Sequence, residues 1–145
     1  MTSSTFALFN PAGLYDPTPN AYSHLAVVPP GGRWLFVAGQ GGEDARGELS
    51  HVFAEQAAQA IANVRTALQS KGADLRDVFK LTLLIADHSE QRLRIWVEQA
   101  DRAWAGCNKP VCTLIPVPRL ALDGMMLEIE AVAAIASPTG VQDGV

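Results

Sequence analysis

The C-terminal quarter constrains the fold of this chain more than any other stretch. From Lys109 to Ala133 it reads KPVCTLIPVPRLALDGMMLEIEAVA, in which two apolar runs flank a turn with proline and glycine. The runs at 111–117 and 125–135 have the length and the apolar, β-branched content that are typical of strands. Proline and glycine at 118–124 favour a turn between them. The chain is therefore predicted to end in two strands joined by a turn.

The last of these strands alternates between apolar and acidic side chains. One face carries the apolar set, which is Leu127, Ile129, Ala131 and Ala133. Glu128 and Glu130 share the other face, about 7 Å apart along the strand. That separation suits a pair of acid–base groups. The simpler interpretation is that one glutamate pairs with a basic residue across the sheet while the other lines its inner face.

Two amphipathic patterns upstream predict helices. From Val52 to Lys71 the apolar residues recur at spacings of three and four, with Ser50 as the expected N-cap and Gly72 as the residue that ends the helix. The same periodicity runs from about Ser89 to Ala105.

Three further runs predict strands: His24–Val28, Trp34–Ala38 and Val78–Ala86. Pro29-Pro30-Gly31-Gly32 separates the first two by a hairpin or a turn. The resulting order, β-β-α-β-α-β-β, predicts an α+β fold with a mainly antiparallel mixed sheet and both helices on one face. We expect a partner to bury the opposite face, because it also carries apolar residues.

Length and charge narrow the function classes. At 145 residues the chain is expected to form a single domain with its core from Tyr22 to about Ile135, a loop-rich N-terminus at 1–20 and a flexible tail at 137–145. A net charge of −4 without a basic cluster argues against nucleic acid as a partner. No signal peptide or membrane span is apparent, and two cysteines are too few for a disulfide framework, so we expect a cytoplasmic protein. The three histidines have no metal-site or triad spacing, and no metal is expected.

Short motifs along most of the chain, in matching order and spacing, resemble the RidA (YjgF) family. They are Tyr22-Ser23, Leu35 to Gln40, Gly47-Glu48-Leu49, Gln56, Asn63, Gly72 to Thr82, Pro110-x-x-Thr113, Pro118-Arg119-Leu120 and Leu127 to Ala133. The resemblance implies a chorismate mutase-like fold, a homotrimer, and three small clefts between subunits. It also implies hydrolysis of enamines and imines to a 2-keto acid and ammonia, with no cofactor.

The resemblance also implies which residues line the cleft. Family members use a tyrosine, the backbone near a glycine, a glutamate that positions water, and an arginine that binds the substrate carboxylate. Tyr22, Gly39 and Glu128 stand at the first three positions, so Glu128 is the expected catalytic residue. Cys112 replaces the arginine, and the region around Val97 lacks an asparagine that is common in the family.

Cys112 and Arg119 each leave two interpretations open. A thiol cannot imitate a bidentate guanidinium, so Cys112 is either a small, half-buried apolar side chain or a reactive thiol in the pocket wall. A reactive thiol needs a nearby cation, for which Arg119 and Lys109 are the candidates. Arg119 either supplies the missing charge to the substrate or bonds backbone carbonyls or a neighbouring subunit's acid.

Two functions remain open from the sequence. The first is a divergent RidA-like enzyme that hydrolyses an enamine, imine or related metabolite. The second is a small-molecule binder or metabolite sensor that keeps the trimer and the cleft but not the chemistry. Tyr22, Gly39, Cys112 and Arg119 are the expected ligand-contacting positions in either case.

Overall fold

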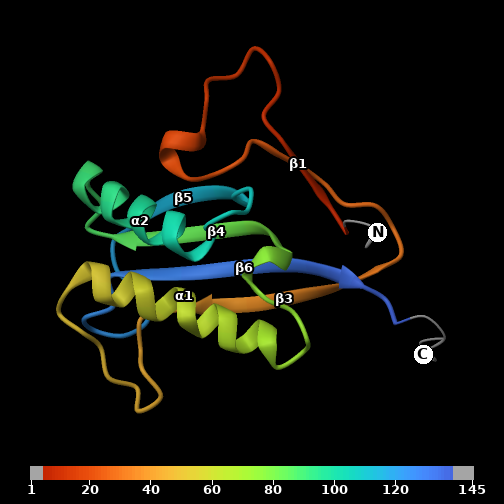
Figure 1. Cartoon of the computed structure of the whole chain (residues 1–145). Coiled ribbons are helices and arrows are strands. Elements are labelled where there is room, and N and C mark those ends of the chain that lie inside the picture. Colours follow the sequence, from red (N-terminus) through yellow and green to blue (C-terminus); the bar gives the residue numbers. More distant parts are fainter. Residues whose placement is uncertain (1–4, 139–145) are drawn as a thin grey trace.

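Four of the five predicted strands form one mixed sheet (Figure 1) in a computed structural model that describes residues 5–138, and the first, His24–Val28, lies outside this sheet. Its strands are β3 (Gly32–Gln40), β4 (Val78–Ala86), β5 (Val111–Val117) and β6 (Leu127–Ala136). They lie in the order β3-β6-β4-β5. The β3–β6 and β6–β4 pairs are antiparallel and the β4–β5 pair is parallel. The predicted fold class is confirmed, with β4 and β5 at the predicted bounds.

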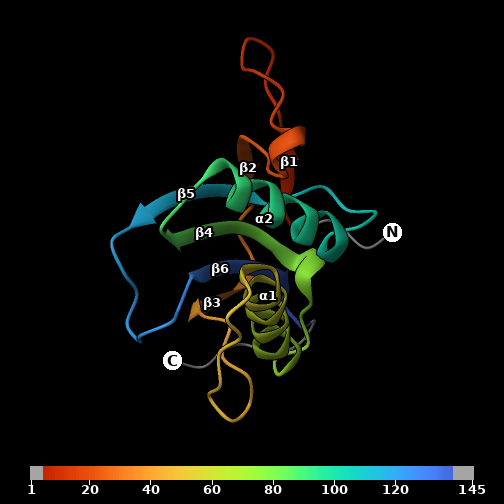
Figure 2. The same cartoon turned by 90° about the vertical axis from the view of Figure 1, so that its left-hand side faces the viewer.

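Helices α1 (Phe53–Gln69) and α2 (Glu90–Ala103) cover the same face of this sheet (Figure 2). Ser89 caps α2, its hydroxyl accepting from the backbone N–H of Arg92 at 3.1 Å. Neither helix is long and apolar enough to cross a membrane, as far as residues 5–138 show.

The sequence predicted the C-terminal end of α1 correctly but not its N-terminal end. Gly72 takes φ of +77°, and the bonds Gly72 N to Gln69 O and Ala73 N to Leu68 O form the predicted glycine-terminated end. The predicted N-cap at Ser50 is wrong, because the helix begins after Val52. The Ser50 hydroxyl accepts instead from the Val52 N–H at 3.0 Å, which makes a local turn before the helix.

The N-terminal segment contains more structure than the sequence predicted. Strand β1 (Ala7–Phe9) pairs antiparallel with β2 (Leu25–Val27) in a separate two-stranded sheet, and a short 3₁₀ turn, η1, spans Thr18–Asn20. The hairpin alternative for Pro29–Gly32 is therefore wrong, and the turn alternative holds. Two successive prolines have no N–H to donate to a ladder, so the chain turns from β2 into the main sheet without pairing β2 to β3. The expected tail lies outside the described residues beyond Pro138.

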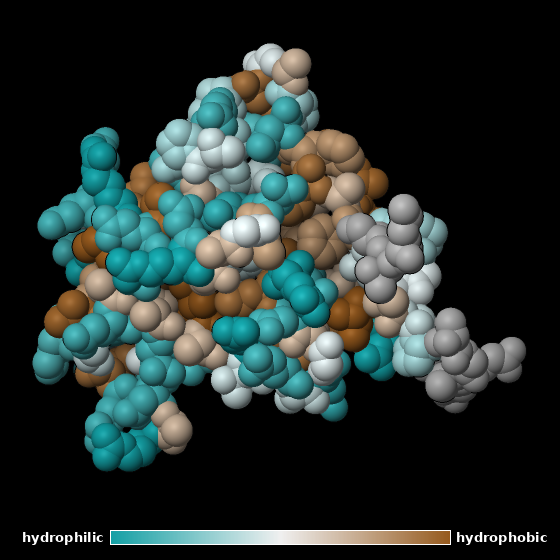
Figure 3. All heavy atoms as spheres, viewed as in Figure 1, coloured by the Kyte–Doolittle hydropathy of each residue, from teal (hydrophilic) through white to brown (hydrophobic). Residues whose placement is uncertain are grey.

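The core lies between the helices and one face of the sheet. That face is apolar along its central strands, with Leu83, Ile85, Leu127 and Ile129 essentially inaccessible to solvent. On the outer sides of the helices the surface is mainly hydrophilic (Figure 3).

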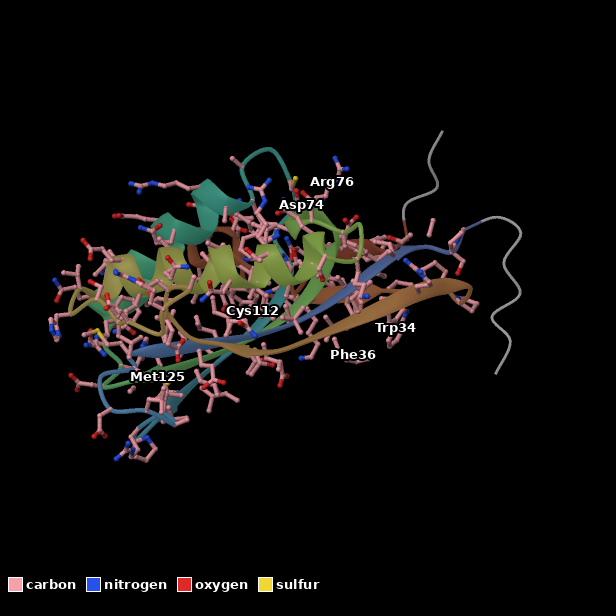
Figure 4. The ribbon with its side chains drawn as sticks, turned by 90° about the horizontal axis from the view of Figure 1, so that it is seen from below. Trp34, Phe36, Asp74, Arg76, Cys112 and Met125 are labelled. Atoms are coloured by element: carbon pink, nitrogen blue, oxygen red, sulfur yellow. The ribbon has the colours of Figure 1, made fainter. Side chains whose placement is uncertain are left out.

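The sheet face away from the helices, which we call the open face, carries large apolar side chains that remain exposed. The exposed fraction is 51% for Trp34, 74% for Phe36 and 42% for Ile115. Trp34 and Phe36 project from β3 on the side opposite the helices (Figure 4). Charged side chains accompany them: Lys80, Glu128 and Glu130 lie on this face, since their strand neighbours Leu81, Leu127 and Ile129 are buried against the helices.

Candidate functional site

Tyr22 is fixed beside the start of β5 by its neighbour Ser23. The Ser23 N–H donates to Pro110 O at 3.1 Å, and its hydroxyl donates to Lys109 O at 2.6 Å. An isolated parallel bridge also pairs Ser23 with Val111. Residues far apart in the sequence are thereby joined, and Tyr22 comes to lie against Cys112.

An N-terminal arm, residues 10–20, supports Tyr22 from outside. In Figures 1 and 2 it projects beyond the sheet on the β5 side. The hydroxyls of Tyr15 and Tyr22 share a hydrogen bond. His24 packs edge-on against both rings, with centroids 5.2 and 5.3 Å away, and its Nε2 lies 2.8 Å from Tyr15 O. The arm and the Tyr22 segment therefore form one aromatic cluster.

A cavity of about 410 Å³ opens between α2 and the beginning of β5. Tyr22 and Cys112 line it from one side. Its apolar walls come from both layers of the fold: Leu83, Leu93, Trp96 and Leu114. The sequence predicted Tyr22 and Cys112 as pocket residues but missed the wall from α2, since its apolar stripe reads as ordinary core.

Two polar groups of this cavity, the Cys112 thiol and the Tyr22 hydroxyl, are held in their neutral forms. Burial raises the pKa of the Cys112 thiol to about 12, and the charge of Lys80 offsets this only in part. Burial, and then the hydrogen bond to Tyr15, raises the pKa of Tyr22 to about 12. At neutral pH both groups are uncharged, which favours the small, half-buried interpretation of Cys112 over a reactive thiolate.

The cations expected near Cys112 are engaged elsewhere. Arg119 lies in the turn before β6, where its Nη2 is 2.8 Å from Asp123 Oδ1 and its Nε donates to Leu120 O. Lys109 pairs with Asp101 at 3.4 Å. The charge that acts on Cys112 belongs to Lys80, on the neighbouring strand, which the sequence did not single out. The missing signal was the strand register. Because β4 and β5 are parallel and Leu81 lies opposite Cys112, the preceding residue Lys80 comes close to Cys112.

Gly39 and Glu128 meet on the open face. The β3–β6 ladder is irregular between Val37 and Gln40, and the Glu128 side chain lies against the backbone there. A Cβ at Gly39 would stand 2.0 Å from Glu128 Oε1, so only glycine leaves room for this carboxylate. Glu130 lies farther along β6, where the Thr82 hydroxyl donates to it at 3.4 Å.

Gln56 and Asn63, two positions of the family resemblance, hold the loops around this carboxylate. The buried Gln56 amide donates to Ser50 O and Gly124 O and accepts from the Met126 N–H, at 2.7 to 2.9 Å. Asn63 donates to Gly41 O and Glu43 O at 3.0 and 2.8 Å. Both side chains therefore have structural roles: they fasten the loop after Gly39 and the approach to β6 onto α1.

The predicted site residues thus fall into two groups on opposite faces of the sheet. The cavity half contains Tyr22 and Cys112, which lies on the helix side with Leu81. The carboxylate half contains Gly39 and Glu128, on the open face. Arg119 belongs to neither half within this chain. One subunit alone does not bring the two halves together.

Comparison with known proteins adds the following findings. A family model described as Endoribonuclease L-PSP matches residues 16–135. Human 2-iminobutanoate/2-iminopropanoate deaminase is 34% identical over 77% of this chain and 78% of its own. A RutC family protein of Pyrococcus horikoshii is 30% identical over 70% of this chain and 79% of its own. Among solved structures, the Rid family protein YyfB of Yersinia pestis, whose function is unknown, superposes with a TM-score of 0.85 at 31% identity, covering 90% of this chain and 99% of that one.

Proposed function

This chain belongs to the RidA (YjgF) family, and we propose that it holds a small metabolite in a cleft between subunits of a homotrimer and hydrolyses an enamine or imine there. The observation that carries this proposal is the separation of the cavity half and the carboxylate half onto opposite faces of one sheet. A neighbouring copy whose cavity half packs on the open face meets the carboxylate half of this copy there. A closed ring of three such contacts needs no further partner.

The open face supports self-association. Trp34 and Phe36 expose more than half of their surface next to one another, with ring centroids 6.1 Å apart. Contiguous apolar patches of this kind mark interaction surfaces on soluble proteins. Light scattering should therefore give a trimer; a stable monomer of about 15.5 kDa at micromolar concentration would contradict the proposal.

In the proposed reaction, water adds to the C=N carbon and the C–N bond breaks, so the imine becomes a carbonyl compound and ammonia. Glu128 positions the water and takes its proton, and the fit against Gly39 keeps the carboxylate in place. Tyr22 and Cys112 contact the ligand as neutral groups. Arg119 is proposed to contact the ligand at the rim of the cleft.

Cys112→Arg tests this proposal. We expect the wild type to hydrolyse 2-iminopropionate poorly, because the loss of a charge-assisted contact to a carboxylate costs about 2–5 kcal/mol, or roughly 30- to several-thousand-fold in rate. Cys112→Arg should raise the rate, and Glu128→Ala in that background should abolish the gain. The assay is keto-acid formation behind an amino-acid oxidase, corrected for spontaneous hydrolysis. A trimeric Cys112→Arg protein without any gain would contradict hydrolysis at this site.

The second candidate is a small-molecule binder or metabolite sensor of the same architecture, favoured by the absence of Lys and Arg from the cavity wall among the described residues. It predicts ligand binding without turnover by either protein. Nucleic acid is not proposed as a partner, given the net charge of −4, and a cytoplasmic location stays a prediction.

A further inference from the structure

The walls of the cavity half are mainly apolar. Five of its nine lining residues have aliphatic side chains or the aromatic side chains of Tyr and Trp, and among the described residues no Lys, Arg, Asp or Glu lines it. Its volume, about 410 Å³, lies in the range of small-molecule sites. The cavity therefore offers apolar contact over most of a ligand's surface and hydrogen bonds at only a few points.

The polar side chains that line the cavity are Asn20, Tyr22, His88, Cys112 and Thr113. The Tyr22 hydroxyl and the Cys112 thiol both keep their protons at neutral pH, because burial raises their pKa values to about 12. His88 also lines the cavity, and its Nδ1 is buried without a hydrogen-bond partner in the part of the chain that the structure describes. Lys80, the cation that acts on Cys112, is exposed on the open face rather than in the cavity wall.

A carboxylate would enter such a cavity at a large cost. Moving an ionised group out of water without a paired cation is strongly unfavourable, whereas a neutral polar group needs only one or two hydrogen bonds. Apolar walls favour the remaining carbon skeleton through the hydrophobic effect.

We infer that the ligand of this cavity is an uncharged imine, or the ketone or aldehyde that it yields, with an aromatic or branched aliphatic body and no carboxylate. The inference rests on the proposed function for the location of the site, and it adds the class of substrate. In the reaction, the oxygen of water forms the new bond to carbon, the C–N bond breaks, and ammonia leaves, so no oxidant or cofactor is needed.

Phenylacetone and phenylpyruvate form a matched pair of probes, because they share the benzyl ketone and differ only in a methyl group against a carboxylate. Isothermal titration calorimetry of the full chain at neutral pH should give at least roughly 10-fold tighter binding of phenylacetone, about 1.4 kcal/mol. Cys112→Arg should reverse this order by supplying the cation. Leu93→Trp, which fills the cavity from α2, should abolish phenylacetone binding. Leu93→Phe provides a milder block if the larger residue disturbs the fold.

Wild-type protein that binds phenylpyruvate as tightly as phenylacetone would overturn the inference, and so would binding of neither probe at millimolar concentration. Phenylacetone binding that survives a folded Leu93→Trp or Leu93→Phe protein would also overturn it. The proposed function is judged separately by 2-iminopropionate turnover in Cys112→Arg. Preference for phenylacetone without that gain supports the uncharged ligand and contradicts hydrolysis.

Discussion

The cavity half and the carboxylate half of the proposed cleft differ in how much space surrounds their side chains. Around Tyr22 and Cys112 there is an open volume lined by side chains from the N-terminal arm, β4, α2 and β5. Around Glu128 there is none, since a single added carbon at Gly39 would overlap the carboxylate. The comparison indicates that the carboxylate half fixes the chemistry in place, while the cavity half decides which ligand is accepted.

The largest effect is expected where the carboxylate half is fastened. Gln56→Leu removes the three hydrogen bonds that the fully buried Gln56 amide makes with Ser50 O, Gly124 O and the Met126 N–H, which should cost about 3 kcal/mol of unfolding free energy. Urea unfolding measures it. Gln99→Leu, at a half-buried position of α2, is the matched control and should change stability by less than about 0.5 kcal/mol. Equal effects of the two substitutions would show that the Gln56 amide does not hold this half.

The next effect concerns the neutral thiol of the cavity half. With a pKa of about 12, Cys112 should react with iodoacetamide at pH 8 at least about 100-fold more slowly than the exposed Cys107. Single-cysteine proteins, Cys107→Ser and Cys112→Ser, allow each rate to be followed by mass spectrometry. Comparable rates would mean that Cys112 is a reactive thiol after all.

The same raised pKa predicts how stability depends on pH. A thiol whose pKa rises on folding from 9.0 to about 12 stabilises the fold fully below pH 9 and loses that contribution as the pH rises towards 12. The slope from this group is at most about 1.4 kcal/mol per pH unit. Cys112→Ala should remove it from the unfolding free energies measured between pH 9 and 12, and an unchanged slope would contradict the burial of the thiol.

A smaller effect, about 10- to 100-fold in rate, is expected from Gly39→Ala. The new Cβ should turn the Glu128 carboxylate aside at little cost in stability, because only a flexible side chain has to move. The readout is 2-iminopropionate hydrolysis in the Cys112→Arg background. In a Glu128→Ala protein the same substitution should change nothing further. An equal loss in both backgrounds would place the effect in the backbone rather than in the carboxylate.

The smallest effect is expected at the arm. Tyr15→Phe removes the hydrogen bond to Tyr22, so the pKa of Tyr22 should fall from about 12 but stay above 10, because burial is the larger cause of its rise. The chain has only two tyrosines, so the ultraviolet titration of Tyr15→Phe reports Tyr22 alone. Tyr22→Phe gives the matching curve for Tyr15. An unchanged pKa of Tyr22 in Tyr15→Phe would show that the arm does not act on the cavity half.

The sequence predicted the elements better than the places where they meet. Periodicity is a local property, so β4, β5 and the two helices could be found from it. The three residues of β1 are too few for such a signal, and their pairing with β2 depends on contacts across the arm. The residue types of the site could be read from motifs, but their division between two faces could not, because it follows from strand register and the Ser23–Val111 bridge.

The sequence also did not show which charged residue lies near Cys112. Arg119 and Lys109 were the candidates near Cys112 along the chain, yet each has an acid of its own within reach, Asp123 and Asp101. Lys80 is 32 positions away in sequence (112 − 80) and one strand away in space. Sequence distance therefore misjudged which cation matters.

The N-terminal arm has a consequence for how this protein can diversify. It is anchored at one end by β1 and at the other by the Ser23 contacts. Residues 11–16 of the arm are exposed, whereas Pro17 is buried and the turn η1 contacts α2. Insertions, deletions or substitutions at 11–16 can therefore occur without disturbing the sheet or the helices. Since Tyr15 in this arm touches Tyr22, such changes would reach the ligand through Tyr22. Lineages that share the whole scaffold could in this way acquire different ligands through a segment of about half a dozen residues.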